Sequence, residues 1–269
     1  MHFYKYHGLG NDFVLTLDQD GTVEAFPERA VRICDRHTGI GADGWMLVRR
    51  SDHCDAQMVL YNSDGSQAEM CGNGLRCFAK FVREQGIVTK DDFTVQTLAG
   101  VMQVQYRNGL ITANIGKPDF ARQAIPMVGS GECDREKLTV LDRTFTVSAC
   151  LMGVPHLVVF GEHFTEEEIR KYGPALEVHP AFPRKTNVNF VERIDENTVY
   201  VRTWERGCGR TLACGTGSSA SAVLCHRAGF TKAKTEVRLQ EGSLFIEDTE
   251  DGVIMTGPAA FAFEGDTEL

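Results

Sequence analysis

Hydrophobic side chains follow two different spacings along the chain, and these predict both helices and strands. Residues 75–82 and 220–225 are mostly apolar, and each run lies a few residues after a cysteine and ends a few residues before a glycine. A short helix that is apolar nearly all round is typical of a buried helix. We therefore predict one buried helix after Cys71 and another after Cys214.

The stretches around these helices alternate between apolar and polar residues, as half-buried strands do. Residues 102–106 alternate in this way, Asn108-Gly109 is typical of a hairpin turn, and residues 110–112 supply a second strand. Each half of the chain therefore predicts a curved mixed sheet around one central helix. This pattern indicates the α+β class.

The chain also contains a long internal repeat. Five glycines of the first half recur at an offset of 143 residues in the second, where chance predicts about one coincidence. These glycines are Gly10, Gly72, Gly74, Gly86 and Gly109, which recur as Gly153, Gly215, Gly217, Gly229 and Gly252. The repeat indicates duplication of a whole domain. Gly and Pro at residues 116–119 place the domain break there.

Composition and charge narrow the possible partners. The chain has 269 residues, 42% of them hydrophobic, and a formal net charge of −9. An acidic chain without a basic block is not expected to bind nucleic acid. No window approaches the roughly 18 apolar residues that a membrane span needs, so we expect no membrane association. Nine cysteines without a Cys-x-x-Cys pair indicate reduced thiols in the cytoplasm.

Both predicted helices begin with the same pattern, Cys71-Gly72-Asn73-Gly74 and Cys214-Gly215-Thr216-Gly217. Glycines let a ligand approach the backbone, and the first N–H groups of a helix have no partner within the helix. Such a start binds anions and is expected to lower the pKa of a cysteine placed on it.

Two thiols at one anion site indicate a specific reaction. Inversion of a stereocentre needs a base on one face and an acid on the other, and a thiolate and a thiol can exchange these roles. The helix amides would hold a carboxylate and stabilise the charge that develops on it. We therefore predict an enzyme with Cys71 and Cys214 as its acid/base pair, a small-molecule substrate, and neither cofactor nor metal.

Five segments together resemble the diaminopimelate epimerase family over nearly the whole chain. The segments are residues 7–13, 35–44, 62–76, 186–190 and 205–217. The resemblance implies a pyridoxal-independent epimerase that interconverts LL- and meso-diaminopimelate in lysine biosynthesis. It also implies a homodimer and two pseudo-symmetric domains, each a mixed sheet curled into a barrel around a central helix. We expect these domains at residues 1–117, joined by a C-terminal strand at 257–269, and at residues 118–256.

The resemblance also implies roles for individual residues. Cys71 and Cys214 match the family's two acid/base thiols, and His156 and Glu205 match the residues that tune them. The remaining matches would bind substrate, either at the helix starts or around its distal end. They are Asn11, Asn62, Gly72, Asn73, Asn187, Glu205, Arg206, Gly215 and Thr216.

Two departures from the family pattern leave alternatives open. Val154 stands where the family often has a substrate-binding Asn, and Gly44 where some members have Gln. A related pyridoxal-independent racemase for another amino acid is therefore the second hypothesis. A third is a thiol or zinc-binding redox protein, because five residues separate Cys71 from Cys77 and five separate Cys208 from Cys214. Zinc-binding cysteines are usually separated by two to four residues, so this spacing argues against zinc.

Overall fold

The computed structural model describes residues 1–24 and 26–269. The chain forms two compact units: unit 1 comprises Met1–Asn114 and Thr256–Leu269, and unit 2 comprises Ile115–Met255. The polypeptide thus leaves unit 1 after Asn114 and returns to it within strand β17 (Gly252–Pro258). The domain boundaries predicted from the sequence lie after residues 117 and 256.

Unit 1 contains a mixed sheet in which β18, β1, β2, β3, β4, β6, β7 and β8 follow one another. The pairs β2–β3 and β4–β6 are parallel, and the other pairs are antiparallel. The short β5 pairs with β4 alongside this order. The bounds are β1 (His2–Gly8), β2 (Asn11–Leu17), β3 (Gly44–Arg49), β4 (Ala56–Asn62), β5 (Gln67–Ala68), β6 (Asp92–Thr97), β7 (Gly100–Arg107), β8 (Leu110–Asn114) and β18 (Ala260–Asp266).

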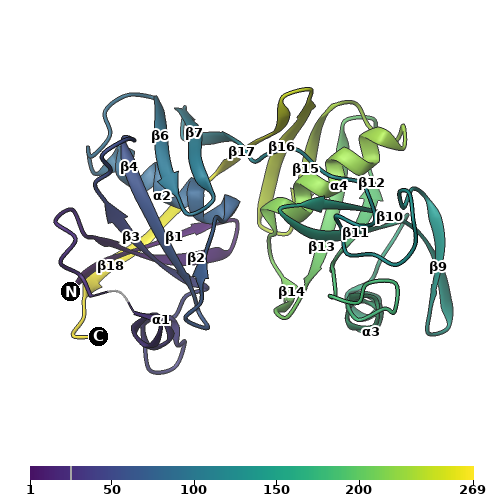
Figure 1. Cartoon of the computed structure of the whole chain (residues 1–269), viewed down its shortest axis with the longest axis horizontal. Coiled ribbons are helices and arrows are strands. Elements are labelled where there is room, and N and C mark those ends of the chain that lie inside the picture. The colour runs from purple at the N-terminus through teal and green to yellow at the C-terminus, as the bar shows by residue number, and fades with distance from the viewer. Residues whose placement is uncertain (25) are drawn as a thin grey trace. The chain divides into compact units, whose positions relative to one another are not determined.

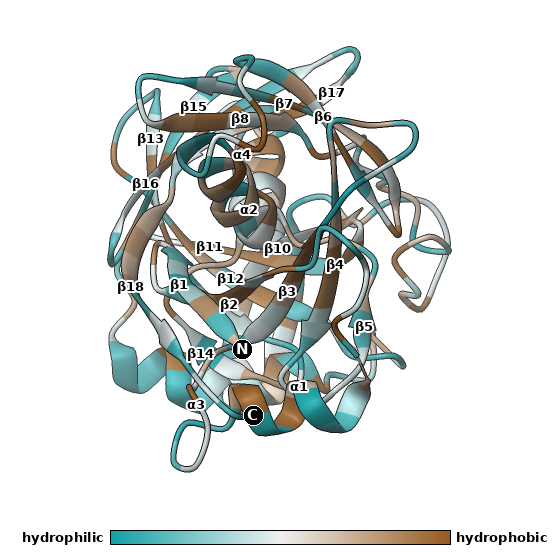
Figure 2. Cartoon of the chain, turned by 90° about the vertical axis from the view of Figure 1, so that its left-hand side faces the viewer, coloured by the Kyte–Doolittle hydropathy of each residue, from teal (hydrophilic) through white to brown (hydrophobic). Residues whose placement is uncertain are grey.

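Two helices accompany this sheet. Helix α2 (Gly72–Glu84), shown in Figure 1, packs against β1, β2, β3, β4, β7 and β8. Its aromatic residues Phe78 and Phe81 are fully buried. Helix α1 (Pro27–Cys34) is amphipathic and lays Ile33 on β3 and β4, so it shows both brown and teal segments in Figure 2. Helix α2 therefore lies in the core of unit 1, and α1 packs on strands β3 and β4.

Unit 2 repeats this arrangement with β9, β10, β11, β12, β13, β15 and β16 in sequence. The pairs β11–β12 and β13–β15 are parallel, the other pairs are antiparallel, and β14 pairs with β13. The bounds are β9 (Glu136–Val140), β10 (Arg143–Met152), β11 (Val154–Gly161), β12 (Asn187–Arg193), β13 (Thr198–Glu205), β14 (Gly209–Thr211), β15 (Lys234–Leu239) and β16 (Gly242–Thr249).

The helices of unit 2 also match those of unit 1. Helix α4 (Gly215–Arg227) packs against β10, β11, β12, β13, β15 and β16, and α3 (Glu166–Glu177) covers β12, β13 and β14 (Figure 1). Even the register is repeated, since Phe13 pairs with Gly44 and His156 pairs with Asn187, each 143 residues later. The predicted α+β class, with two pseudo-symmetric mixed sheets around central helices, is confirmed.

Candidate functional site

The first candidate centre lies at the start of α2, where Cys71 is the N-cap residue. Its extended backbone (φ −138°, ψ 121°) turns the chain into the helix, and its Sγ accepts a hydrogen bond from the Gly74 amide at 3.5 Å. Asn11 of β2 lies beside it: the Cys71 Sγ is 3.9 Å from Asn11 Oδ1. The Asn73 side chain donates to the same oxygen at 3.1 Å. Asn11, Cys71 and Asn73 are therefore brought together in unit 1.

The second centre lies at the start of α4, where Cys214 takes the same N-cap position. Its backbone is also extended (φ −128°, ψ 111°), and its Sγ is 3.6 Å from Thr216 Oγ1. The environment is tighter, since only 5% of Cys214 is exposed whereas Cys71 is half-buried. Both helices begin at the glycine that follows the cysteine, as the sequence predicts.

The electrostatics of Cys214 differ from the sequence-based expectation. Burial raises the pKa of the Cys214 thiol well above its usual value, and the negative charge of Glu205 raises it further. Hydrogen bonds from Thr216 and the Gly217 amide oppose this shift but are smaller. The expected lowering of the pKa is therefore wrong for Cys214, because loss of solvent outweighs the helix amides.

Glu205 reaches Cys214 from the last position of β13. Its Oε1 accepts a hydrogen bond from the Thr211 hydroxyl at 2.6 Å, and Thr211 lies on β14, the other strand of the hairpin. The hairpin therefore orients the carboxylate. Thr211 was not among the predicted site residues, and its hydroxyl can be identified only once β13 and β14 are paired.

Arg206 follows Glu205 in the turn between these strands, and Asn187 fixes its backbone. Asn187 Oδ1 accepts a hydrogen bond from the Arg206 amide at 2.9 Å, while its Nδ2 donates to the Pro155 carbonyl at 2.9 Å. The Arg206 guanidinium donates to the Arg184 carbonyl at 3.2 Å. Asn187 is buried, so in this structure it positions the turn that carries Arg206.

His156 of β11 is fully buried, and burial followed by the charge of Arg206 lowers its pKa to about 3. Asn189 Nδ2 lies 3.2 Å from His156 Nδ1 and 3.3 Å from the Leu157 carbonyl. Since a carbonyl only accepts, this amide group is a donor, so Nδ1 accepts and Nε2 carries the proton. Asn189 was not singled out by sequence, although its position two residues after Asn187 on one strand was a usable signal.

Three positions remain: the predicted substrate-binding residue Asn62, and Gly44 and Val154, which depart from the family pattern. Asn62 ends β4 and donates to the Ser66 hydroxyl at 3.0 Å, and it is exposed. A Cβ at Gly44 would lie 2.9 Å from the Tyr61 carbonyl, so the space at this backbone position suits glycine. Val154 begins β11 and is half-buried.

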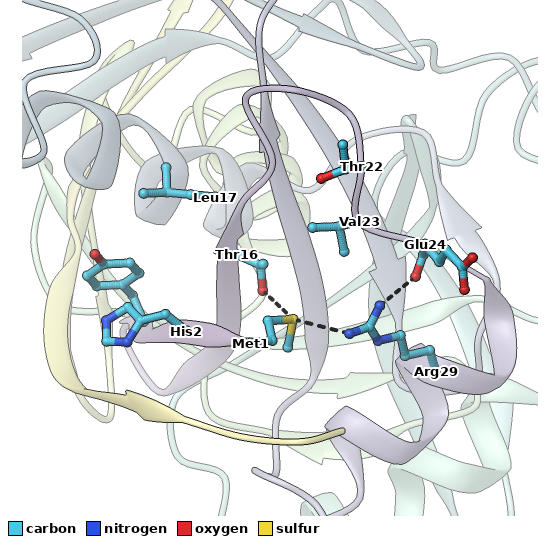
Figure 3. A pocket seen from close by; sticks show the side chains of 9 residues that line it. Met1, His2, Thr16, Leu17, Thr22, Val23, Glu24 and Arg29 are labelled. Atoms are coloured by element: carbon cyan, nitrogen blue, oxygen red, sulfur yellow. Dashed lines mark hydrogen bonds between the residues drawn. The ribbon is translucent and has the colours of Figure 1, made fainter.

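Other features of the described residues do not coincide with these centres. Within residues 1–24 and 26–269, no group of three or more His, Cys, Asp or Glu side chains could hold a metal ion. A cavity of about 510 Å³ lies in unit 1 beside the N-terminus, and Figure 3 shows Met1, Thr16 and Arg29 lining it. Arg29 already donates to the Glu24 carbonyl at 2.9 Å. None of the helices of the described chain is long and apolar enough to cross a membrane.

Known proteins are similar to this chain over its whole length. A family model described as diaminopimelate epimerase matches residues 3–121 and 148–262. A diaminopimelate epimerase from Desulforudis audaxviator is 45% identical over 276 residues, and the match covers 98% of each chain. A diaminopimelate epimerase from Heliobacterium modesticaldum is 44% identical over 281 residues, which cover 100% of each chain.

Solved structures show a similar fold at low sequence identity. A hydroxyproline epimerase from Agrobacterium vitis has a TM-score of 0.71 and 14% identity, covering 98% of this chain and 91% of that one. A PhzF-family phenazine biosynthesis protein from Bacillus anthracis has a TM-score of 0.70 and 19% identity, covering 100% and 99%. At these identities the likeness concerns the fold alone.

Proposed function

The chain belongs to the diaminopimelate epimerase family, and from this membership we propose that it interconverts LL- and meso-diaminopimelate without pyridoxal phosphate. The observation that carries the proposal is the pair of helix starts at Cys71 and Cys214, one in each unit. A symmetric pair of thiols suits a reaction in which base and acid exchange roles between the two directions. We assign the reaction to lysine biosynthesis, as the resemblance implies.

In the proposed reaction one sulfur is a thiolate and the other a thiol. The thiolate takes the proton from the α-carbon, so a C–H bond breaks and an S–H bond forms. The thiol on the opposite face then gives its proton to the carbanion, so an S–H bond breaks and a C–H bond forms. No electrons are gained or lost overall, and the two sulfurs exchange protonation states at each turnover.

The backbone at the two helix starts would hold the reacting carboxylate. The amides of Gly72 and Asn73 in α2, and of Gly215 and Thr216 in α4, belong to first turns whose N–H groups have no partner within the helix. Negative charge moves from the α-carbon toward the carboxylate as the proton leaves. The same amides therefore stabilise the transition state more than the bound substrate.

The distal end of diaminopimelate carries an ammonium and a carboxylate, and we assign its recognition to Arg206 and Glu205 with Asn11, Asn62 and Asn187. A guanidinium can clamp a carboxylate with two hydrogen bonds. The hydrogen bond from the Arg206 amide to Asn187 supports this assignment, because it fixes the backbone from which the Arg206 side chain extends. His156 and Glu205 are assigned to tuning the thiols.

We further propose that residues 1–117 with 257–269, and residues 118–256, are the two functional halves, each supplying one thiol. We also propose a cytoplasmic homodimer that uses no cofactor. Phe261 and Phe263 on β18 are about half exposed, 47% and 49%, and a second copy of the chain would remove such rings from water. Analytical ultracentrifugation would measure the oligomeric state, and a monomer would contradict this assignment.

The direct test is an assay of the purified chain with LL-diaminopimelate in deuterium oxide. We expect conversion to the meso form, followed by chiral chromatography, with one deuterium entering at the inverted carbon. Proline and alanine, which have one stereocentre, and 4-hydroxyproline, which has two, serve as comparison substrates. Comparable turnover of any of these would favour the racemase alternative suggested by Val154. Stoichiometric zinc in active protein would favour the zinc-protein hypothesis.

A further inference from the structure

The two helix starts differ in the charged residues around them. Five residues after Cys71, helix α2 carries Arg76, whereas the matching position of α4, 143 residues later, is Ser219. At the end of β13, unit 2 carries Glu205, whereas the matching end of β4 in unit 1 is Asn62. At these positions unit 1 therefore has a cation where unit 2 has a serine, and unit 2 has a carboxylate where unit 1 has an amide.

Arg76 is held close to the Cys71 end of α2. Its side chain is fully buried (0% exposed), and its Nη1 donates to the Gly72 carbonyl at 3.4 Å. Its Nε donates to the Pro258 carbonyl at 3.0 Å. A Cβ on Gly8 would lie 2.9 Å from the Arg76 Nη2, so the glycine of β1 leaves room for the guanidinium.

The charge of this guanidinium acts on Cys71. Burial lowers the pKa of Arg76, and attraction to the ionised sulfurs of Cys77 and Cys71 opposes this shift. Arginine still keeps its proton throughout the working pH range. Such interactions are strong in a buried position, where water does not screen them. Burial raises the pKa of Cys77 to about 12, so Cys71, which is half-buried, is the thiol that can use this charge.

The other charged groups near α2 do not reverse this effect. The negative charge of Asp12 of β2 acts on Cys77, and Asp12 forms ion pairs with Lys5 of β1 and with Arg36 at 2.7 Å each. Asn11 Oδ1 can accept a hydrogen bond from the neutral Cys71 thiol, but at 3.9 Å this contact is long and weak, whereas the Asn73 side chain donates to the same oxygen at 3.1 Å. The Gly74 amide donates to the sulfur and favours its ionised form.

The surroundings of Cys214 favour the neutral thiol. Ser219 donates its hydroxyl to the Gly215 carbonyl at 3.0 Å and carries no charge. Glu205 of β13 acts against ionisation, as does burial. His156 of β11 is neutral above pH 6 and supplies no positive charge. Arg193 and Arg227 act on Cys225 and Cys150, at other positions of the unit 2 core.

We propose that the free enzyme holds Cys71 as the thiolate and Cys214 as the thiol, and that Arg76 is the positioning residue that sets this order. The inference rests on the proposed two-thiol function and adds its starting state. When the α-carbon proton of a substrate faces Cys71, the base that removes it is already ionised. Turnover in that direction leaves Cys71 protonated and Cys214 ionised, so protons must redistribute before the next identical turnover.

Alkylation with iodoacetamide, without substrate, tests the proposal because only thiolates react. Rates at each cysteine are followed by peptide mass spectrometry from about pH 5 to about pH 10. The pH midpoint reports ionisation, whereas accessibility changes only the plateau rate. We expect the midpoint of Cys71 to lie at least about two pH units below that of Cys214. A lower midpoint at Cys214 would overturn the proposal.

Substitutions identify the role of Arg76. Arg76→Gln should raise the Cys71 midpoint by at least about one pH unit, a tenfold loss of thiolate at lower pH, and Arg76→Lys should restore most of it. The Cys214 midpoint should not move. Arg83→Gln is the matched control on α2, since Arg83 pairs with Asp91 at 2.8 Å, and it should leave both midpoints unchanged. An unchanged Cys71 midpoint in Arg76→Gln would refute the role of Arg76.

A second variant and a separate activity assay distinguish failure of this inference from failure of the proposed function. If Arg76→Gln does not fold, Glu205→Gln tests the other half of the asymmetry, and it should lower the Cys214 midpoint by about one pH unit while leaving that of Cys71 in place. The opposite response would contradict the proposed order. Epimerisation of LL-diaminopimelate by the wild type is assayed separately, so a reversed order with full activity refutes only this inference.

Discussion

The start of α2 and the start of α4 have the same backbone arrangement but different chemical surroundings. Both begin with Cys-Gly-x-Gly, and both place the cysteine at the N-cap. Cys71 is half-buried beside Arg76, whereas Cys214 is 5% exposed beside Glu205. Duplication has thus supplied the same helix start twice, which we propose as the carboxylate-binding backbone, and a few side chains make the surroundings of the two thiols different.

The residues behind the two helices also differ between the units. In unit 1 Phe13 lies beside Gly74, whereas in unit 2 the equivalent position is His156, which joins a buried polar network with Asn189 and Thr203. One helix start therefore rests on an aromatic ring and the other on hydrogen-bonded amides. Inversion by the proposed two-base mechanism uses one proton carrier on each face of the substrate carbon, and the two thiols proposed for these roles have different surroundings.

The largest effect is expected when either sulfur is replaced. Cys71→Ser or Cys214→Ser should reduce epimerisation at least about 10³-fold, because a hydroxyl is a far weaker acid than a thiol. Elimination from a halogenated substrate analogue needs one base and should persist in at least one variant. Exposed Cys208→Ser is the control with expected wild-type rate. Near wild-type epimerisation by Cys71→Ser or Cys214→Ser would contradict the two-thiol assignment.

A smaller loss is expected at the distal end of the substrate, where the units also differ. Arg206→Lys should lower kcat/KM for LL-diaminopimelate about tenfold or more, because an ammonium cannot replace the planar fork of a guanidinium. Arg135→Lys, an exposed arginine of the same unit, is the matched control. Equal kcat/KM values for Arg206→Lys and the wild type would remove Arg206 from substrate recognition.

The elements that sequence predicts well are those determined by local pattern. The starts of α2 and α4 follow from Cys-Gly-x-Gly and the apolar runs after it, and the repeat predicts that both units share one topology. Strands as short as β5 (Gln67–Ala68) leave no recognisable periodicity. Their existence depends on pairing with β4, which sequence spacing does not reveal.

The chemistry of the site was less predictable because it depends on residues distant in sequence. The pKa of Cys214 was expected to be lowered, since a helix start is a local feature, but burial and Glu205 decide it. Asn189 and Thr211 gain their roles only when β11 pairs with β12 and β13 with β14. Local sequence therefore predicts which groups react, whereas their ionisation depends on tertiary packing.

The buried imidazole of His156 in unit 2 should make stability depend on pH. The folded pKa of His156 is about 3, and its unfolded value is about 6.5. Below pH 6.5 the unfolded chain binds a proton that the folded chain does not, so stability is full above that pH and falls as pH drops toward 3. Between pH 8 and pH 5 we expect a loss of about 2 kcal/mol in the free energy of unfolding.

Urea unfolding at several pH values measures this loss. His156→Gln should flatten the dependence between pH 8 and pH 5, and exposed His53→Gln should leave it unchanged. The window lies above the range in which Asp12 titrates, because its pKa is lowered to about 2 by Arg36 and Lys5 against the cost of its burial. A His156→Gln profile as steep as that of the wild type would show that another group causes the loss.

The smallest effect is expected at the third residue of each central helix, Gly74 in α2 and Gly217 in α4. A Cβ on Gly217 would lie 2.3 Å from Asn189 Oδ1 and 3.2 Å from the Cys214 Cβ, whereas a Cβ on Gly74 would meet nothing closer than 3.4 Å. Asn189 cannot retreat easily, because His156, Leu157 and Thr203 hold its side chain. Gly74→Ala should therefore stay within about 1 kcal/mol of the wild type, since alanine favours the helix.

Gly217→Ala should instead lower the free energy of unfolding by about 1 to 2 kcal/mol, because overpacking outweighs the gain in helix propensity. Urea unfolding of both variants under one condition gives the comparison directly. Adding Asn189→Ala to Gly217→Ala should cost less than the sum of the two single changes, since it removes the oxygen that clashes. Equal effects of the two glycine substitutions, or strictly additive ones in the double variant, would mean that the amide network does not constrain the start of α4.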